Sequence, residues 1–122
     1  MTYKQGFFVM FNLLDDYYLE DVNNNDLAIL LSSMNPGLFE GSYSADPAYW
    51  EDWKRILREK AIKEPISTDS LLDMICSFLD YYQREFEFNL RVVIEKINEL
   101  SKESELLIKY MKQAEAEQTD CG

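Results

Sequence analysis

The chain of 122 residues contains no histidine. Histidine is the commonest general base and a very common metal ligand, so its absence excludes Ser-His-Asp and Cys-His catalysis in their usual forms. It also excludes the Glu-x-x-His pattern of di-iron helical bundles. A zinc site would need two distant cysteines together with carboxylates, which is a poor ligand set. We therefore expect no metal, no cofactor and no enzymatic activity.

Glycine and proline are scarce, with four and three residues. The glycines are isolated from one another and form no phosphate-binding loop. So few turn residues also disfavour an all-β sandwich. The length is that of one domain, and the apolar content is too high for a disordered chain.

Only two cysteines are present, Cys76 and Cys121. Cys76 falls within an apolar helical pattern and Cys121 lies next to the C-terminus, so the pair does not indicate a disulfide framework. The N-terminal residues lack the features of a signal peptide. The apolar stretch from Phe7 to Leu14 is too short to span a membrane. These observations predict a cytoplasmic protein.

Basic residues are almost missing from the first part of the chain. Residues 1–53 hold nine acidic side chains and one basic side chain, Lys4, whereas residues 54–122 hold fourteen acids and eleven bases. The isoelectric point near 4.3 argues against binding to nucleic acid or to anionic membranes, because both repel a negative protein. The acidic first part is also rich in aromatic residues, a combination that suits a surface for a basic protein partner.

We predict that this surface is built from acidic side chains before and within the helices of the first part. The predicted partner-binding residues are Asp15, Asp16, Glu20, Asp21, Asp46, Glu51 and Asp52. On a helical wheel Asp16 and Glu20 fall opposite the apolar stripe of their helix. The alternative interpretation is a solvated acidic coat that only keeps the protein soluble.

Apolar periodicity predicts an all-α fold with five or six helices in a single compact domain, residues 1–117, followed by a loose tail, 118–122. Helices are expected over residues 3–20, over 26–34 with Asn25 as its N-cap, from Asp46-Pro47 to about Glu59, and over 69–84 after a Ser67 or Thr68 cap. Residues 37–46 look irregular. The expected core includes Phe7, Phe11, Leu14, Trp50, Trp53, Ile75, Leu79 and Val93.

A break is expected at Phe86-Glu87-Phe88, with Asn89 capping the next helix. The last segment, 90–116, is either one long helix or two helices that meet near Ser101, because Ser104 interrupts its apolar stripe.

Two local motifs allow a functional interpretation beside a structural one. The run from Asp21 to Asp26 resembles the start of a calcium loop, but the loop needs glycine sixth and glutamate twelfth, where this chain has Asp26 and Ser32. A turn followed by a helix cap is the better interpretation. Trp50 and Trp53 could stack on a ligand, although their spacing beside Ile56 is more typical of a core stripe.

Three stretches resemble small bacterial immunity proteins. They are Leu13 to Tyr18, Met34-Asn35-Pro36, and the acidic-aromatic run Ser44 to Trp53. Such proteins guard a cell against its own polymorphic toxins, as in contact-dependent growth inhibition. The resemblance covers roughly residues 5–85 and implies a small cytosolic protein that covers the active site of one toxin domain, often a nuclease. The family has no shared catalytic motif, so the resemblance assigns no site residue.

The independent charge argument agrees with this resemblance, because a nuclease needs a basic cleft for phosphate and an acidic inhibitor can imitate that phosphate. We therefore expect a toxin-binding protein that is a monomer when free. One alternative is a helical adaptor or oligomerisation module that acts through its C-terminal helix. Another is an enzyme that uses carboxylates alone, although no spacing in the chain supports it.

Overall fold

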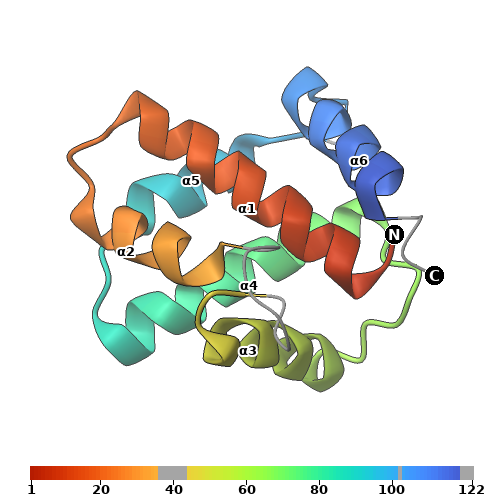
Figure 1. Cartoon of the computed structure of the whole chain (residues 1–122), viewed down its shortest axis with the longest axis horizontal. Coiled ribbons are helices and arrows are strands. Elements are labelled where there is room, and N and C mark those ends of the chain that lie inside the picture. The colour runs from red at the N-terminus through yellow and green to blue at the C-terminus, as the bar shows by residue number, and fades with distance from the viewer. Residues whose placement is uncertain (36–43, 102, 119–122) are drawn as a thin grey trace.

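The computed structural model describes residues 1–35, 44–101 and 103–118. Within these ranges the chain forms six helices and no strand, which confirms the predicted all-α single domain (Figure 1). The helices are α1 (Tyr3–Glu20), α2 (Asn25–Met34), α3 (Pro47–Glu59), α4 (Thr68–Phe86), α5 (Arg91–Glu99) and α6 (Glu105–Gln118). None of the described helices is both long and apolar enough to cross a membrane.

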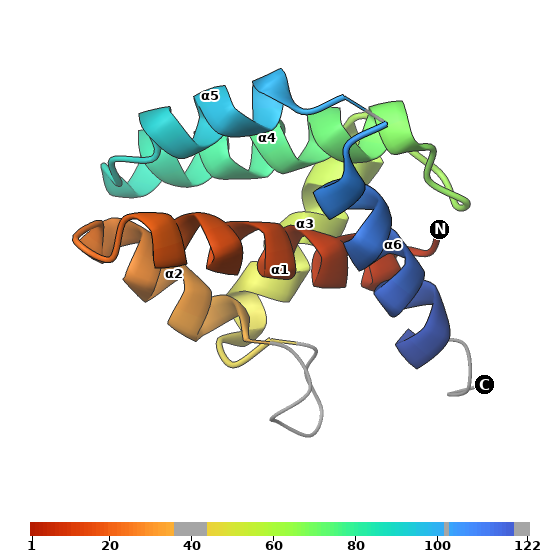
Figure 2. The ribbon, with the colours of Figure 1, turned by 90° about the horizontal axis from the view of Figure 1, so that it is seen from above.

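The helices are arranged around α1. Helices α2 and α6 pack against α1, and α6 crosses it at a steep angle (Figure 2). Helix α5 returns along α4, so that these two form a hairpin on one side of α1. Helix α3 packs on α4 and also contacts α1 and α2. The α1–α2 turn and the α4–α5 turn therefore lie at the same end of the molecule (Figure 1).

Helix α1 begins with a capping box. The Thr2 hydroxyl accepts the N–H of Gln5 at 3.1 Å, and the Gln5 side chain accepts the N–H of Thr2 at 2.8 Å. One turn in, Gly6 allows a close approach of three elements, because a Cβ there would lie 3.2 Å from Leu71 and 3.3 Å from Trp53. The first helix is thus fixed in place by both its cap and its packing.

Helix α3 begins as the sequence predicts. The Asp46 carboxylate accepts the N–H of Ala48 at 3.0 Å, and Pro47 occupies the first turn. Trp53 is fully buried in the centre of the core and donates its indole N–H to the Tyr3 carbonyl at 3.0 Å. The indole is therefore a core residue, as predicted.

Two residues of the predicted core are less buried than expected. Phe7, Leu14, Trp53, Ile75, Leu79 and Val93 are buried, whereas Phe11 and Trp50 are half-buried at the edge of the core. Phe11 stands at the margin of the α1 stripe. Trp50 lies in the first turn of α3, where the Lys54 ammonium sits 5.3 Å from the centre of its ring. Neither side chain is enclosed by helices on all sides.

The helix caps differ from the prediction at two places. Asn24, not Asn25, caps α2, and its side chain accepts the N–H of Leu27 at 3.1 Å. Helix α5 follows Leu90 without a side-chain cap, and Asn89 does not serve as one. The N–H of Asn89 instead donates to the Asp26 carboxylate at 2.8 Å, because the two turns lie together.

The C-terminal segment is two helices rather than one, with the break that Ser104 predicted. Helix α6 includes Gln118, which the prediction assigns to the tail; the other residues of that predicted tail, 119–122, lie outside the described ranges. Most of the predicted irregular segment, residues 37–43, also lies outside them.

Candidate partner-binding surface

The seven predicted partner-binding carboxylates fall into two groups. Asp15, Asp16, Glu20 and Asp21 lie at the C-terminal end of α1, and Asp46, Glu51 and Asp52 lie at the start of α3. The two groups border different helices: the first faces α5 and α6, and the second faces α4.

The carboxylates of α3 are largely committed to the fold. Asp46 caps the helix. Asp52 is half-buried; it accepts the Tyr82 hydroxyl at 2.6 Å and pairs with Arg55 at 3.3 Å. Burial, followed by this hydrogen bond to a carboxylate, raises the pKa of Tyr82. Glu51 is exposed and pairs with Lys54 at 3.0 Å.

In the α1 group, Asp16 is not on an open face as the helical wheel suggested. It is half-buried and accepts the Tyr110 hydroxyl, because α6 packs over this side of α1. Burial and this hydrogen bond raise the pKa of Tyr110 to about 12. The neighbouring Asp15 is exposed and has no ion-pair partner among the described residues.

Glu20 is the residue that joins α1 to α5. It pairs with Lys96 at 2.6 Å, and the Lys96 ammonium also lies 5.3 Å from the centre of the Tyr17 ring. Burial, and then the negative charge of Glu20, raise the pKa of Tyr17 to about 12. The phenols of Tyr17, Tyr82 and Tyr110 therefore all stay protonated at neutral pH.

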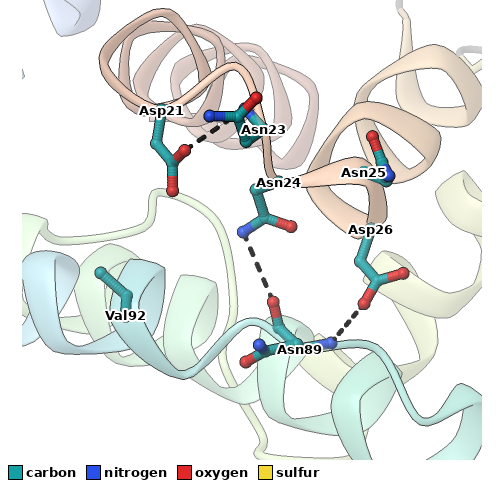
Figure 3. A pocket seen from close by; sticks show the side chains of 7 residues that line it. All are labelled: Asp21, Asn23, Asn24, Asn25, Asp26, Asn89 and Val92. Atoms are coloured by element: carbon teal, nitrogen blue, oxygen red, sulfur yellow. Dashed lines mark hydrogen bonds between the residues drawn. The ribbon is translucent and has the colours of Figure 1, made fainter.

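Beyond Glu20, the two turns at this end of the molecule enclose a polar pocket of about 400 Å³ (Figure 3). Asn24 donates its side-chain amide to the Asn89 carbonyl at 3.5 Å, and Asp26 accepts the Asn89 N–H at 2.8 Å. These two bonds hold the α1–α2 turn against the α4–α5 turn. The lining residues are Asp21, Asn23, Asn24, Asn25, Asp26, Asn89 and Val92.

The pocket presents mostly oxygen acceptors and amides. Asp21 uses one carboxylate oxygen to accept the N–H of Asn23 at 3.3 Å, which leaves a carboxylate charge at the rim. Carboxylate and amide oxygens accept hydrogen bonds from lysine and arginine side chains. Among the described residues, however, no group of three or more Cys, Asp or Glu side chains is arranged to hold a metal ion.

Three exposed apolar side chains belong to the pocket wall or to the chain beside Asp21. Leu19 is 66% exposed, Val22 56% and Val92 54%. Leu19 and Val22 flank Asp21 in the chain, and Val92 forms part of the pocket wall. Large apolar side chains at the surface, next to polar groups, are typical of protein-binding sites. We call this surface, the pocket residues together with Leu19 and Val22, the turn surface.

A second hollow of about 460 Å³ adjoins the pocket and shares Asn89 with it. Gln83, Glu87, Phe88 and Arg91 form the rest of its lining. Sequence reasoning identified Asp21 at the turn surface but missed the contribution of the α4–α5 turn. Only the three-dimensional contact between the two turns brings these residues together.

Comparisons with protein-family models, with curated proteins and with solved structures gave no match to this chain.

Proposed function

We propose that this chain binds and neutralises a basic bacterial toxin domain, in the manner of the immunity proteins that its sequence resembles. The observation that carries the proposal is the turn surface. It combines an acidic, oxygen-lined pocket with three exposed apolar side chains, at the end of a protein whose net charge is −11.

In this proposal the two kinds of side chain have separate roles. Asp21 and the asparagine amides accept hydrogen bonds from a lysine or arginine of the toxin. Leu19, Val22 and Val92 become buried against the toxin, and the removal of their apolar surface from water favours the complex. The net negative charge speeds encounter with a basic partner, an effect that salt screens beyond about 8 Å at physiological ionic strength.

In this proposal the protein is a cytoplasmic monomer. It acts without catalysis and without a metal ion, and it binds neither nucleic acid nor membrane. The alternative is an adaptor that oligomerises through its C-terminal helix. It would need an apolar stripe on α6 that is exposed to solvent. Leu107, Tyr110 and Ala114 of that helix are instead buried within the fold of one chain. No observation favours the alternative.

The test is co-expression with the product of the gene immediately upstream. We expect that product to stop growth when it is expressed alone, and this chain to restore growth and to elute with it as a complex. A toxic product whose effect this chain does not relieve would contradict the proposal, and so would the absence of any toxic product.

A matched pair of variants tests the role of the turn surface in the same assay. Val92→Lys places a positive charge on an exposed apolar position of the pocket wall, and should reduce both rescue and complex formation. Ile108→Lys makes the same change on α6, at a position that is 37% exposed, and should have no effect. Equal rescue by both variants would place the interface elsewhere.

A further inference from the structure

Phe86, the last residue of α4, is 53% exposed, and its ring packs on a stack of other aromatic rings. Its ring stacks on Tyr82 at 5.1 Å between centroids, with 21° between the ring planes. Tyr82 stacks in turn on Tyr49 at 4.5 Å and is held by its hydrogen bond to Asp52. The Phe86 ring is thus pre-positioned while half of its surface faces solvent, which favours its use as a rigid contact.

Carboxylates flank this ring on both sides in the chain. Glu85 and Glu87 are exposed, and neither has an ion-pair partner among the described residues. The nearby cations have other partners: Arg84 pairs with Asp80 at 2.8 Å, and the closest carboxylate to Arg91 is Glu95 at 4.0 Å.

The backbone at Glu87 is also unusual. Its φ of 57° lies in the left-handed region, where glycine would end the helix with less strain. A charged residue in such a position costs stability that the fold could have avoided.

Elsewhere in the molecule, one of the chain's own arginines is held by an aromatic ring and two carboxylates. The Arg55 guanidinium lies 4.7 Å from the centre of the Tyr81 ring, and it also bonds Glu59 at 2.6 Å and Asp52 at 3.3 Å. An aromatic face with two carboxylates thus holds an arginine. Planar guanidinium groups stack on rings and pair with carboxylates, whereas a lysine ammonium is a compact, strongly hydrated charge.

We propose that Glu85, Phe86 and Glu87 form a docking site, here called the arginine anchor, for an arginine side chain of the basic partner. The guanidinium would stack on the exposed part of the Phe86 ring, and the two carboxylates would accept its N–H groups. The inference rests on the proposed function for the existence of a basic partner. It adds which residue of that partner is recognised, next to the turn surface.

The test uses two peptides of equal charge, hexa-arginine amide and hexa-lysine amide, titrated into the ¹⁵N-labelled protein. We expect hexa-arginine to shift the amide signals of residues 85–88 and to bind about two- to fivefold more tightly than hexa-lysine, the size of an exposed cation–π contact. Phe86→Leu keeps an apolar side chain but removes the ring, so it should abolish this preference. Equal affinity for the two peptides, or shifts centred away from residues 85–88, would overturn the proposal.

A charge-matched pair of variants provides the control. Glu85→Gln combined with Glu87→Gln should weaken hexa-arginine binding several-fold, and this pair also serves if Phe86→Leu fails to fold. Glu105→Gln combined with Glu115→Gln removes two exposed charges on α6 and should alter binding of the two peptides equally. If growth rescue succeeds while the peptides are not distinguished, the arginine anchor alone is wrong. If the peptides are distinguished while rescue fails, the toxin-binding role is wrong and the arginine site stands.

Discussion

The carboxylates at the start of α3 have a different role from those at the end of the molecule where the α1–α2 and α4–α5 turns meet. We call the latter, Asp21, Glu85 and Glu87, the carboxylates of the turn end. Asp46 and Asp52 satisfy a helix cap, a buried hydroxyl and a guanidinium within the fold. Among the described residues, Glu85 and Glu87 have no ion-pair partner, and the Asp21 carboxylate accepts a hydrogen bond only from the Asn23 N–H in its own turn. The difference shows that negative charge at the surface becomes available to a partner only where the fold does not already use it.

The largest expected effect is on the α3 side. Asp52→Ala leaves the buried Tyr82 hydroxyl without its acceptor and should lower the free energy of unfolding by about 2–3 kcal/mol, the size of a hydrogen bond to a charged group. The neighbouring Glu51→Ala removes an exposed ion pair and should cost less than about 1 kcal/mol. Urea denaturation of both variants measures the difference. Equal losses would show that Asp52 is not a structural carboxylate.

A second adjacent pair lies on α1. Asp16→Ala removes the acceptor of the Tyr110 hydroxyl and should cost about 1–2 kcal/mol, with faster hydrogen exchange in α6. Asp15→Ala, at an exposed position, should stay within about 0.5 kcal/mol of the parent protein. If Asp16→Ala left the exchange of α6 unchanged, Asp16 would not help to hold α6 on α1.

A smaller effect of opposite sign is expected at the arginine anchor. Glu87→Gly relieves the left-handed strain and should stabilise the fold by about 1 kcal/mol, while it weakens binding of hexa-arginine. Glu85→Gly, inside the last turn of α4, should destabilise by up to about 1 kcal/mol. Thermal melts of the two variants give the signs. A loss of stability in Glu87→Gly would show that the left-handed conformation of Glu87 is not strained.

No effect is expected from calcium. The turn pocket contains only two carboxylates and lacks the glycine and glutamate of a calcium loop. A ligand that binds only the folded state must raise the melting temperature, so calcium should leave it unchanged. A saturable rise that Asp21→Asn abolishes would overturn this prediction.

Much of the fold could be predicted because local signals are strong in this chain. The Asp46-Pro47 start of α3 and the apolar stripe of α1 gave the helices and most of the core. The exposure of Asp16 could not be predicted, because its partner Tyr110, on the helix that covers it, lies 94 residues later in the chain. The turn surface could not be predicted either. Asp26 and Asn89 are 63 residues apart, and no periodicity reports their contact.

The same limit applies to the acidic residues as a set. Composition predicts that a basic partner would be attracted, but it cannot separate Asp52, which bonds a buried tyrosine, from Glu51 beside it. The sequence pattern predicts Phe86 only as part of a helix break. The structure adds that the Phe86 ring is exposed and stacks on Tyr82.

The most direct test of this account measures how fast the proposed toxin domain associates with two charge-matched double variants. Asp21→Asn with Glu87→Gln changes the turn end, and Asp46→Asn with Glu51→Gln changes the start of α3. The new asparagine keeps an acceptor oxygen for the turn at position 21 and for the helix cap at position 46. We predict that the first double variant slows association at low salt several-fold and flattens its salt dependence, whereas the second behaves nearly as the parent protein. An equal slowing by both, or a larger slowing by the α3 variant, would contradict the claim that the partner is received at the turn end.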